Sequence, residues 1–142
     1  MKQSYEDLEI YQLAKKLAIE VHKMTLDELP KFEMYEEGGQ IRRSSKSTGS
    51  NIVEGFGRKK YKGEYVQFLT YSLSSCDETK YHLDILSETG SLAKSRSKYF
   101  KEKYIELGRK IYNFRETIIA SSPMPPVTER KKSKSANASA DL

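Results

Sequence analysis

Very few residues of this chain could carry out covalent chemistry. Its 142 residues include two histidines, His22 and His82, and one thiol, Cys76. A nucleophilic thiol needs a base within hydrogen-bond reach, and two residues six apart, such as Cys76 and His82, lie on different sides of any helix that contains both. We interpret Cys76 as a small buried thiol and the imidazole as a surface group, and we expect no enzymatic activity.

A metal centre is not predicted either. In four-helix bundles with a di-metal site, inward Glu residues combine with Glu-x-x-His pairs, three residues apart, on two helices. Here His82 follows Glu78 by four residues, and no acid stands three residues before His22. We therefore expect neither a metal nor another cofactor.

Two basic clusters remain as candidate binding sites. In the first, Arg58-Lys59-Lys60-Tyr61-Lys62, four cations bracket one aromatic ring. Cations beside an exposed ring are typical of surfaces that neutralise phosphates and stack bases. The second cluster, Arg130-Lys131-Lys132-Ser133-Lys134, would add sequence-independent attraction to nucleic acid. The alternative for both clusters is an ordinary solvated surface.

The elements that position these clusters are predicted from hydrophobic periodicity. Apolar residues recur at steps of three and four, which indicates amphipathic helices over residues 6–26, 40–55, 63–88 and 94–120. Ser4 is a candidate cap with Asp7 as its closing partner, and Pro30 and Gly90 are expected to separate helices. The last helix has the clearest stripe: Phe100, Tyr104, Leu107, Ile111, Phe114 and Ile118.

The second predicted helix carries an unusual face of small residues. These are Ser44, Ser45, Ser47, Gly49 and Ser50. They leave little side-chain volume, so we expect a neighbouring helix to approach closely. Gly55 and Gly57 are candidates for the left-handed conformation that ends a helix.

Four such helices predict an all-α fold, an up-and-down antiparallel four-helix bundle over residues 1–120. Residues 121–142 form a Pro/Ser-rich basic tail, which we expect to be disordered because it buries too little apolar surface. The net charge alternates along the chain, at −4 for residues 1–37, +6 for 38–62, −4 for 63–90 and +5 for 91–120. Helices adjacent in sequence would therefore carry opposite charge, which favours this topology.

Composition indicates the compartment and suggests assembly. One cysteine cannot form an internal disulfide, and the N-terminal residues are charged rather than apolar, so we expect a cytoplasmic protein. No apolar run approaches the ~18 residues of a membrane span. Ten Tyr and five Phe exceed what four narrow seams require, which suggests a subunit contact. The alternative is that tyrosines occupy the bundle rim, with their hydroxyls in water.

Several segments resemble one known family. The most specific is Ser50–Arg58, which contains Asn-Ile-x-Glu-Gly-x-Gly-Arg, and the others are Tyr5–Gln12, Gln40–Arg43, Glu64–Leu69 and Ser72–Glu78. They are similar to the small bacterial four-helix-bundle proteins encoded within intervening sequences of 23S ribosomal RNA genes. The resemblance covers about residues 5–120 and excludes the tail.

This resemblance implies a homopentameric bundle without known catalytic activity, with a role around RNA. Related bundles, the accessory variability proteins of retroelements, bind a reverse transcriptase and nucleic acid. The chain departs from the family at Gly38-Gly39, where a Thr-Ser pair would cap the helix, and at Thr48-Gly49, where Ile-Pro is usual.

The residues Asn51, Glu54, Gly55 and Gly57 of the specific stretch are interpreted as structural. Glu54 and Arg58 are four apart and can pair along a helix, and Asn51 can bond to backbone carbonyls or a neighbouring helix. Two function classes follow for the chain. One is an accessory factor that binds the RNA or DNA backbone through the basic clusters. The other is a protein-interaction module, for example a partner of a reverse transcriptase, with no direct binding of nucleic acid.

Overall fold

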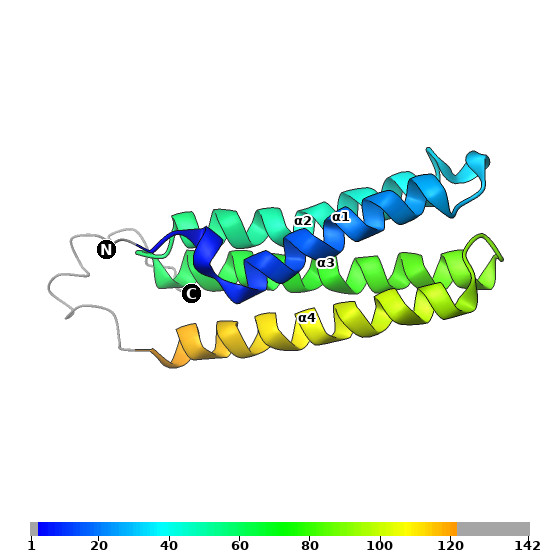
Figure 1. Cartoon of the computed structure of the whole chain (residues 1–142). Coiled ribbons are helices and arrows are strands. Elements are labelled where there is room, and N and C mark those ends of the chain that lie inside the picture. Colours follow the sequence, from blue (N-terminus) through cyan, green and yellow to red (C-terminus); the bar gives the residue numbers. More distant parts are fainter. Residues whose placement is uncertain (1–2, 122–142) are drawn as a thin grey trace, which may run out of the picture.

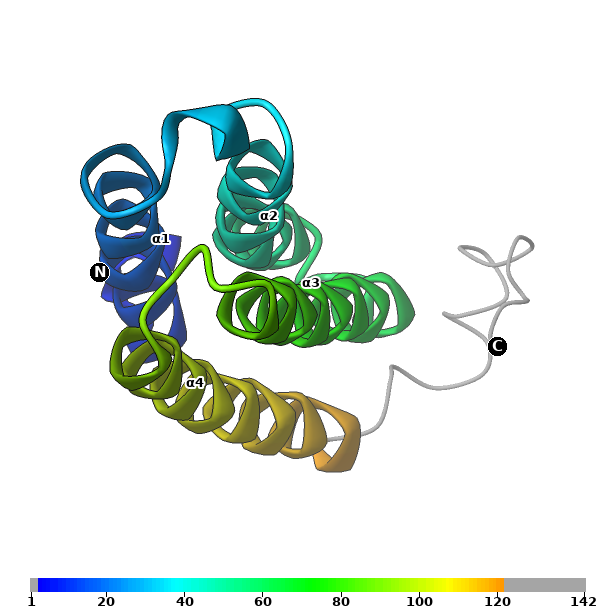
Figure 2. The same ribbon diagram turned by 90° about the vertical axis from the view of Figure 1, so that its right-hand side faces the viewer.

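The computed structural model describes residues 3–121. This part consists of four long helices, α1 (Glu9–Asp27), α2 (Glu37–Gly57), α3 (Lys62–Glu88) and α4 (Lys94–Ala120), and two short 3-10 helices, η1 (Tyr5–Asp7) and η2 (Lys31–Glu33). The long helices run alternately up and down (Figure 1), and each packs against its neighbours in the sequence, while α4 also packs against α1 (Figure 2). The predicted all-α antiparallel bundle is confirmed. Of the predicted tail, only Ser121 lies within the described residues.

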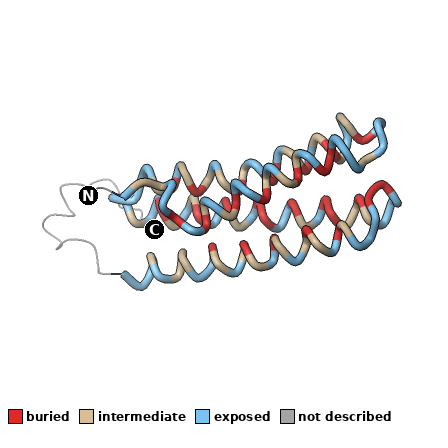
Figure 3. The backbone as a smooth tube through the Cα atoms, in the orientation of Figure 1, coloured by how far each residue is buried: buried red, intermediate tan, exposed pale blue. Residues whose placement is uncertain are grey.

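Each helix turns one buried stripe toward the bundle axis (Figure 3). In α4 the predicted seam is confirmed, because Phe100, Tyr104, Leu107 and Ile111 are fully buried. The last two residues of that seam, Phe114 and Ile118, are only partly buried and pack against the edge of the core. None of the helices in residues 3–121 is long and apolar enough to cross a membrane.

The first long helix begins later than predicted, at Glu9 instead of residue 6. Ser4 and Asp7 do form the expected capping box, with Ser4 Oγ accepting from the Glu6 amide at 3.1 Å and the Ser4 amide donating to Asp7 Oδ2 at 3.0 Å. This box caps η1, however, and not α1. Leu8 then takes an extended conformation that places its side chain in the core, so the chain turns before α1 starts.

The second helix begins earlier than predicted, at Glu37 instead of residue 40. Its cap residue, Glu36, makes no side-chain hydrogen bond, but the carboxylate of Glu33 in η2 accepts from the Glu37 amide at 3.1 Å. Gly38 makes this approach possible, because a Cβ at this position would lie 2.5 Å from the Glu33 carbonyl oxygen. Gly38, inside the first turn of α2, thus permits a close contact between η2 and α2.

The close approach of α2 and α3 is confirmed and is lined by hydroxyl groups. Ser44 Oγ lies 2.8 Å from Thr79 Oγ1, and Ser72 Oγ donates to the Thr48 carbonyl at 2.7 Å. Near the end of α2, a Cβ on Gly55 would lie 3.0 Å from Phe68 Cβ. Small residues on α2 therefore bring the two backbones together, and the buried hydroxyls are satisfied across the interface.

The helix ends differ from the prediction at two of the glycines. Among the described residues, the one with a positive φ is Gly90, at 82°, and it ends α3 as predicted. Gly55 and Gly57 were predicted to take that conformation, but both lie within α2. Gly55 serves the packing against α3 instead, and a Cβ on Gly57 would meet nothing within 4 Å.

Opposite charges meet between adjacent helices, as the alternation of net charge predicts. Lys101 of α4 pairs with Asp84 of α3 at 2.8 Å, and Lys110 of α4 pairs with Glu9 of α1 at 3.1 Å. The guanidinium of Arg96 donates two hydrogen bonds of 2.9 Å to Glu28, just after α1. Each exposed pair contributes about 0–1 kcal/mol. The pairs therefore add little to the free energy of unfolding, and their main effect is to favour this order of helices over other topologies.

Candidate nucleic-acid interface

The first basic cluster forms the turn between α2 and α3 at one end of the bundle. Arg58, Lys59, Lys60 and Tyr61 are exposed, and Lys62 opens α3. Three hydrogen bonds shape the turn, from the amide of Arg58 to the Gly55 carbonyl, from that of Lys59 to Phe56 and from that of Tyr61 to Arg58. The turn is thus tied to the last turn of α2 and presents its side chains to solvent.

Arg58 is already engaged within the bundle. Its guanidinium lies 3.0 Å from Glu64 Oε1 and 3.8 Å from Glu54 Oε1, and it sits 5.2 Å from the centre of the Phe68 ring. The predicted Glu54–Arg58 pair is confirmed, and Arg58 also pairs with Glu64 of α3. This residue ties α2 to α3 and is the least available cation of the turn.

The three lysines of the turn are more accessible. Lys59 Nζ lies 4.1 Å above the Phe56 ring, and Lys62 Nζ donates to the Ser121 carbonyl at 3.3 Å. Lys60 makes neither an ion pair nor a ring contact within the described residues. Tyr61 is 55% exposed, so its ring faces solvent beside these amines. The turn can therefore present cations and one aromatic face to a phosphate chain.

The second basic cluster, Arg130, Lys131, Lys132 and Lys134, lies outside the described residues. The described part of the chain ends beside the first cluster, since the carbonyl of Ser121 accepts a hydrogen bond from Lys62.

Three of the four residues interpreted as structural, Asn51, Glu54 and Gly55, make contacts within the bundle. Asn51 Nδ2 donates to the carbonyl and to the hydroxyl of Ser47 at 2.9 and 3.1 Å, within its own helix. Glu54 holds Arg58, and Gly55 permits the contact with α3. Gly57 fits no packing role, since a side chain there would have open space.

Of the residues that could do covalent chemistry, Cys76 is buried, and His22 is partly exposed at the α1–α2 groove. Desolvation raises the pKa of the Cys76 thiol to about 12, so it stays protonated near neutral pH. Burial also raises the pKa of the Tyr104 phenol, whose ring lies in the core. No group of three potential metal ligands occurs in the described part of the chain.

His82 is buried, which corrects its interpretation as a surface imidazole. Its Nδ1 lies 2.7 Å from Glu37 Oε1, and its Nε2 lies 3.4 Å from Glu78 Oε2. The imidazole therefore connects the first turn of α2 to α3, with a carboxylate at each ring nitrogen. This arrangement satisfies a buried polar ring and places His82 in a structural contact.

The comparisons with known proteins identify the family of the chain. Residues 6–113 match the model of the 23S rRNA-intervening sequence protein. The chain belongs to that family. No curated protein matches the sequence.

A solved structure has a similar fold. It is a protein of unknown function from the S23 ribosomal protein family of Bacteroides thetaiotaomicron, with 18% sequence identity and a TM-score of 0.70. The similarity covers 76% of this chain and 96% of the other. The family match includes the whole α2–α3 turn and ends before the last turns of α4.

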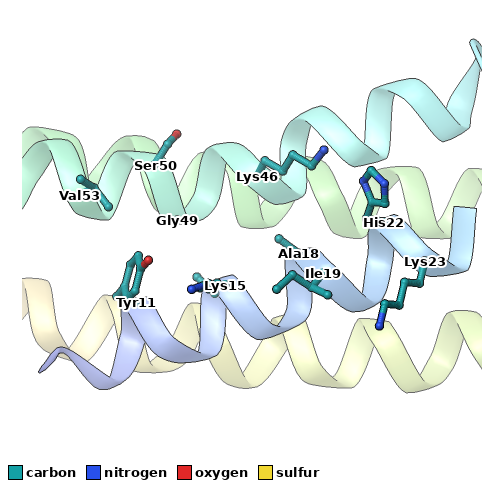
Figure 4. A pocket seen from close by; sticks show the side chains of 11 residues that line it. Tyr11, Lys15, Ala18, Ile19, His22, Lys23, Lys46, Gly49, Ser50 and Val53 are labelled. Atoms are coloured by element: carbon teal, nitrogen blue, oxygen red, sulfur yellow. The ribbon is translucent and has the colours of Figure 1, made fainter. Parts of the chain in front are cut away.

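The structure also brings together three cations that were not predicted as a binding site. Lys15 and Lys23 of α1 and Lys46 of α2 line a groove of about 430 Å³ between the two helices (Figure 4). Its remaining lining is mostly small or apolar, with Ala18 and Gly49 on facing sides. The three lysines are distant in sequence, and two of them lie in a segment of net negative charge, so no local run indicated them.

Proposed function

We propose that this protein is a non-enzymatic, homo-oligomeric accessory factor in the cytoplasm that binds the phosphate backbone of RNA. The α2–α3 turn carries the proposal, because Lys59, Lys60 and Lys62 flank Tyr61 in the chain and the Tyr61 ring is exposed. Arg58 holds the turn in place through Glu54 and Glu64. Amines would neutralise phosphates, and the ring would stack on an unpaired base.

Binding of this kind depends on the charge of the RNA backbone and not on the base sequence. No helix of the turn is placed to reach base edges, so contacts to phosphate and to one stacked base supply no base discrimination. Arg130, Lys131, Lys132 and Lys134 would follow the RNA from the same end of the bundle and add to the electrostatic attraction. The burial of Cys76 and the engagement of His82 support the absence of catalysis.

The test replaces the three lysines of the turn and leaves Arg58 in place. Lys59→Gln, Lys60→Gln and Lys62→Gln together should weaken RNA binding in gel-shift titrations, and deletion of residues 122–142 should weaken it further. On single-stranded RNA, each phosphate that is no longer neutralised reduces the slope of log affinity against log salt by about 0.7, so the slope of the triple variant should be smaller by about 2.

The matched control removes the same charge from the opposite end of the bundle. Lys31 in η2 and Lys94 and Lys98 near the start of α4 are exposed there. Replacing these three with Gln should leave RNA retention unchanged. If the turn variant without the tail retains RNA as well as the parent, the phosphate-binding function is refuted.

The second candidate function is that of a protein-interaction module, such as a reverse transcriptase partner, and the α1–α2 groove favours it. The groove has a small, apolar floor that phosphate contacts would leave uncovered. Oligomerisation, with a homopentamer as the expected form, belongs to both candidates. Light scattering at micromolar concentration tests it, since a mass of 16.4 kDa would identify a monomer.

A further inference from the structure

The outward face of α3 carries a second stripe that the bundle does not cover. Gln67, Tyr71, Ser74, Glu78 and Tyr81 follow one another at steps of four and three, which places them on one line along the helix. Tyr71 is 44% exposed and Tyr81 is 59% exposed. We call this line the α3 ridge. Regular spacing with two exposed aromatic rings is typical of a helix face that packs against a partner.

The α3 ridge is also acidic. Glu78 lies on the ridge and Asp77 lies beside it, whereas Glu64 and Asp84 of the same helix pair with Arg58 and Lys101. Lys80 pairs with Asp77 at 3.2 Å, and Asp77 and Glu78 still keep side chains that are 76% and 54% exposed. The ridge therefore presents tyrosine rings together with exposed carboxylates.

The α1–α2 groove has the opposite character. Its floor and sides include Ala14, Ala18, Ile19, Gly49 and Val53, and no acid lines it. Lys15, Lys23 and Lys46 at its edges make no ion pair within residues 3–121. An apolar channel edged by unmatched amines fits an occupant that is aromatic and acidic.

The two surfaces agree in length as well as in chemistry. At a rise of about 1.5 Å per residue, Tyr11 to Lys23 of the groove span about 18 Å and Tyr71 to Tyr81 of the ridge span about 15 Å. The small residues Ala18 and Gly49 leave room for rings, while the amines can reach Asp77 and Glu78. Residues 122–142 fit less well, because they carry four cations against two acids and would bring like charge to the lysines.

We propose that the α1–α2 groove of one copy receives the α3 ridge of a second copy. This inference rests on the proposed homo-oligomer and assigns its contact. Since α3 lies diagonally across the bundle from α1 (Figure 2), ridge and groove face different ways. Each copy therefore keeps a free groove when its ridge is bound, so the contact is head-to-tail and continues until a ring closes.

The test uses two variants that each lose one surface. The ridge variant carries Tyr71→Ser and Tyr81→Ser, and the groove variant carries Lys15→Glu, Lys23→Glu and Lys46→Glu. All five residues are exposed, so circular dichroism should show parental helix content. Each variant alone should have the mass of one chain, 16.4 kDa, in light scattering, while the parent shows a multiple of it.

Mixing the two variants decides the geometry. The ridge variant keeps an intact groove and the groove variant keeps an intact ridge, so a head-to-tail contact predicts one dimer of twice the chain mass and nothing larger. The control variant, with Lys31, Lys94 and Lys98 each replaced by Glu, should assemble like the parent.

Other outcomes separate the two proposals. A monomeric parent refutes the homo-oligomer and, with it, this contact. A parent and groove variant that assemble equally well place the interface elsewhere and leave the homo-oligomer intact. Monomeric variants that do not combine refute the head-to-tail geometry. A groove variant that stays assembled but loses RNA in a gel shift identifies the groove as a phosphate track and overturns the proposal.

Discussion

The thiol of Cys76 lies on the inner side of α3, where 1% of the residue is exposed. Its pKa is raised to about 12 from an ordinary value of 9.0, because burial penalises the thiolate more than the hydrogen bond with Thr48 and the charge of Lys80 favour it. The protonated thiol is therefore part of the packed core. The interpretation of Cys76 as a small buried thiol is confirmed.

Alkaline pH should weaken the fold through this residue. The unfolded thiol loses its proton above its pKa of 9.0 and the folded thiol only near 12, so the folded state binds more protons in that window. Stability is then full below pH 9.0 and falls by about 1.4 kcal/mol per pH unit as pH rises. Urea unfolding between pH 9 and 10 should show this loss.

Replacement of the thiol supplies the control. Cys76→Ala should lower stability at neutral pH, because it leaves a small cavity, but between pH 9 and 10 its stability should fall less than that of the parent. Three tyrosines whose pKa is raised from 10.0, Tyr65, Tyr99 and Tyr104, add the same loss to both proteins, mostly above pH 10. An equal slope in the parent and in Cys76→Ala between pH 9 and 10 would contradict this role of the thiol.

The turn between α2 and α3 shows what a local run of residues can predict at this scale. The cluster of Arg58, Lys59, Lys60, Tyr61 and Lys62 is exposed as composition indicates. Of the two ion pairs that Arg58 makes, the sequence predicted one. Glu54 is one helical turn away and was identified, whereas Glu64 lies across the turn and pairs only once α3 folds back along α2.

At the scale of elements, periodicity placed α4 correctly at both ends and the end of α3 at Glu88. The starts of α1 and α2 were misplaced because distant contacts decide them. Leu8 leaves the helical conformation to reach the core, and Glu33 extends α2 by accepting the Glu37 amide. The spacing of apolar residues within each helix predicts neither of these contacts.

Glu33 connects three elements and should be the most sensitive carboxylate of the bundle. Its Oε1 accepts from the Glu37 amide, and its Oε2 accepts from the buried Ser91 hydroxyl at 2.6 Å, in the turn before α4. Glu33→Ala leaves both donors without their partner and should lower the free energy of unfolding by about 2 kcal/mol. Urea denaturation followed by circular dichroism measures the change.

Glu36 provides the neighbouring control for this prediction. It is exposed, and although it is the cap residue of α2, its side chain makes no capping hydrogen bond. Glu36→Ala should therefore change stability by less than about 0.5 kcal/mol. If both substitutions cost the same, the start of α2 does not depend on the Glu33 carboxylate.

At the scale of the whole molecule, surfaces where cations pair with acids differ from surfaces where cations have no acidic partner. Three cations of α4 meet acids of neighbouring segments, since Arg96 pairs with Glu28, Lys101 with Asp84 and Lys110 with Glu9. The lysines of the turn, and Lys15 and Lys46 of the groove, make no ion pair within residues 3–121. The cations of the turn could be predicted from consecutive basic residues in the sequence. Those of the groove could not, because the groove forms only when α1 and α2 pack side by side.

Assembly through the groove would multiply the weak turn sites. Copies related by rotation repeat the turn of Lys59, Lys60 and Lys62, so a long RNA can engage several turns at once. Linked weak sites raise overall affinity by about 10²- to 10⁴-fold when one ligand spans them. The parent should therefore bind a long single-stranded RNA far more tightly than an oligonucleotide that covers one turn.

The ridge variant, Tyr71→Ser with Tyr81→Ser, isolates this effect because it keeps every cation of the turn. As a monomer it should bind the short oligonucleotide like the parent and should lose most of the parent's advantage on the long RNA. Fluorescence polarisation with both RNAs at one salt concentration measures the two affinities. Parental affinity of a monomeric ridge variant for the long RNA would mean that one bundle suffices, because a repeated site has no role when a single copy binds as tightly.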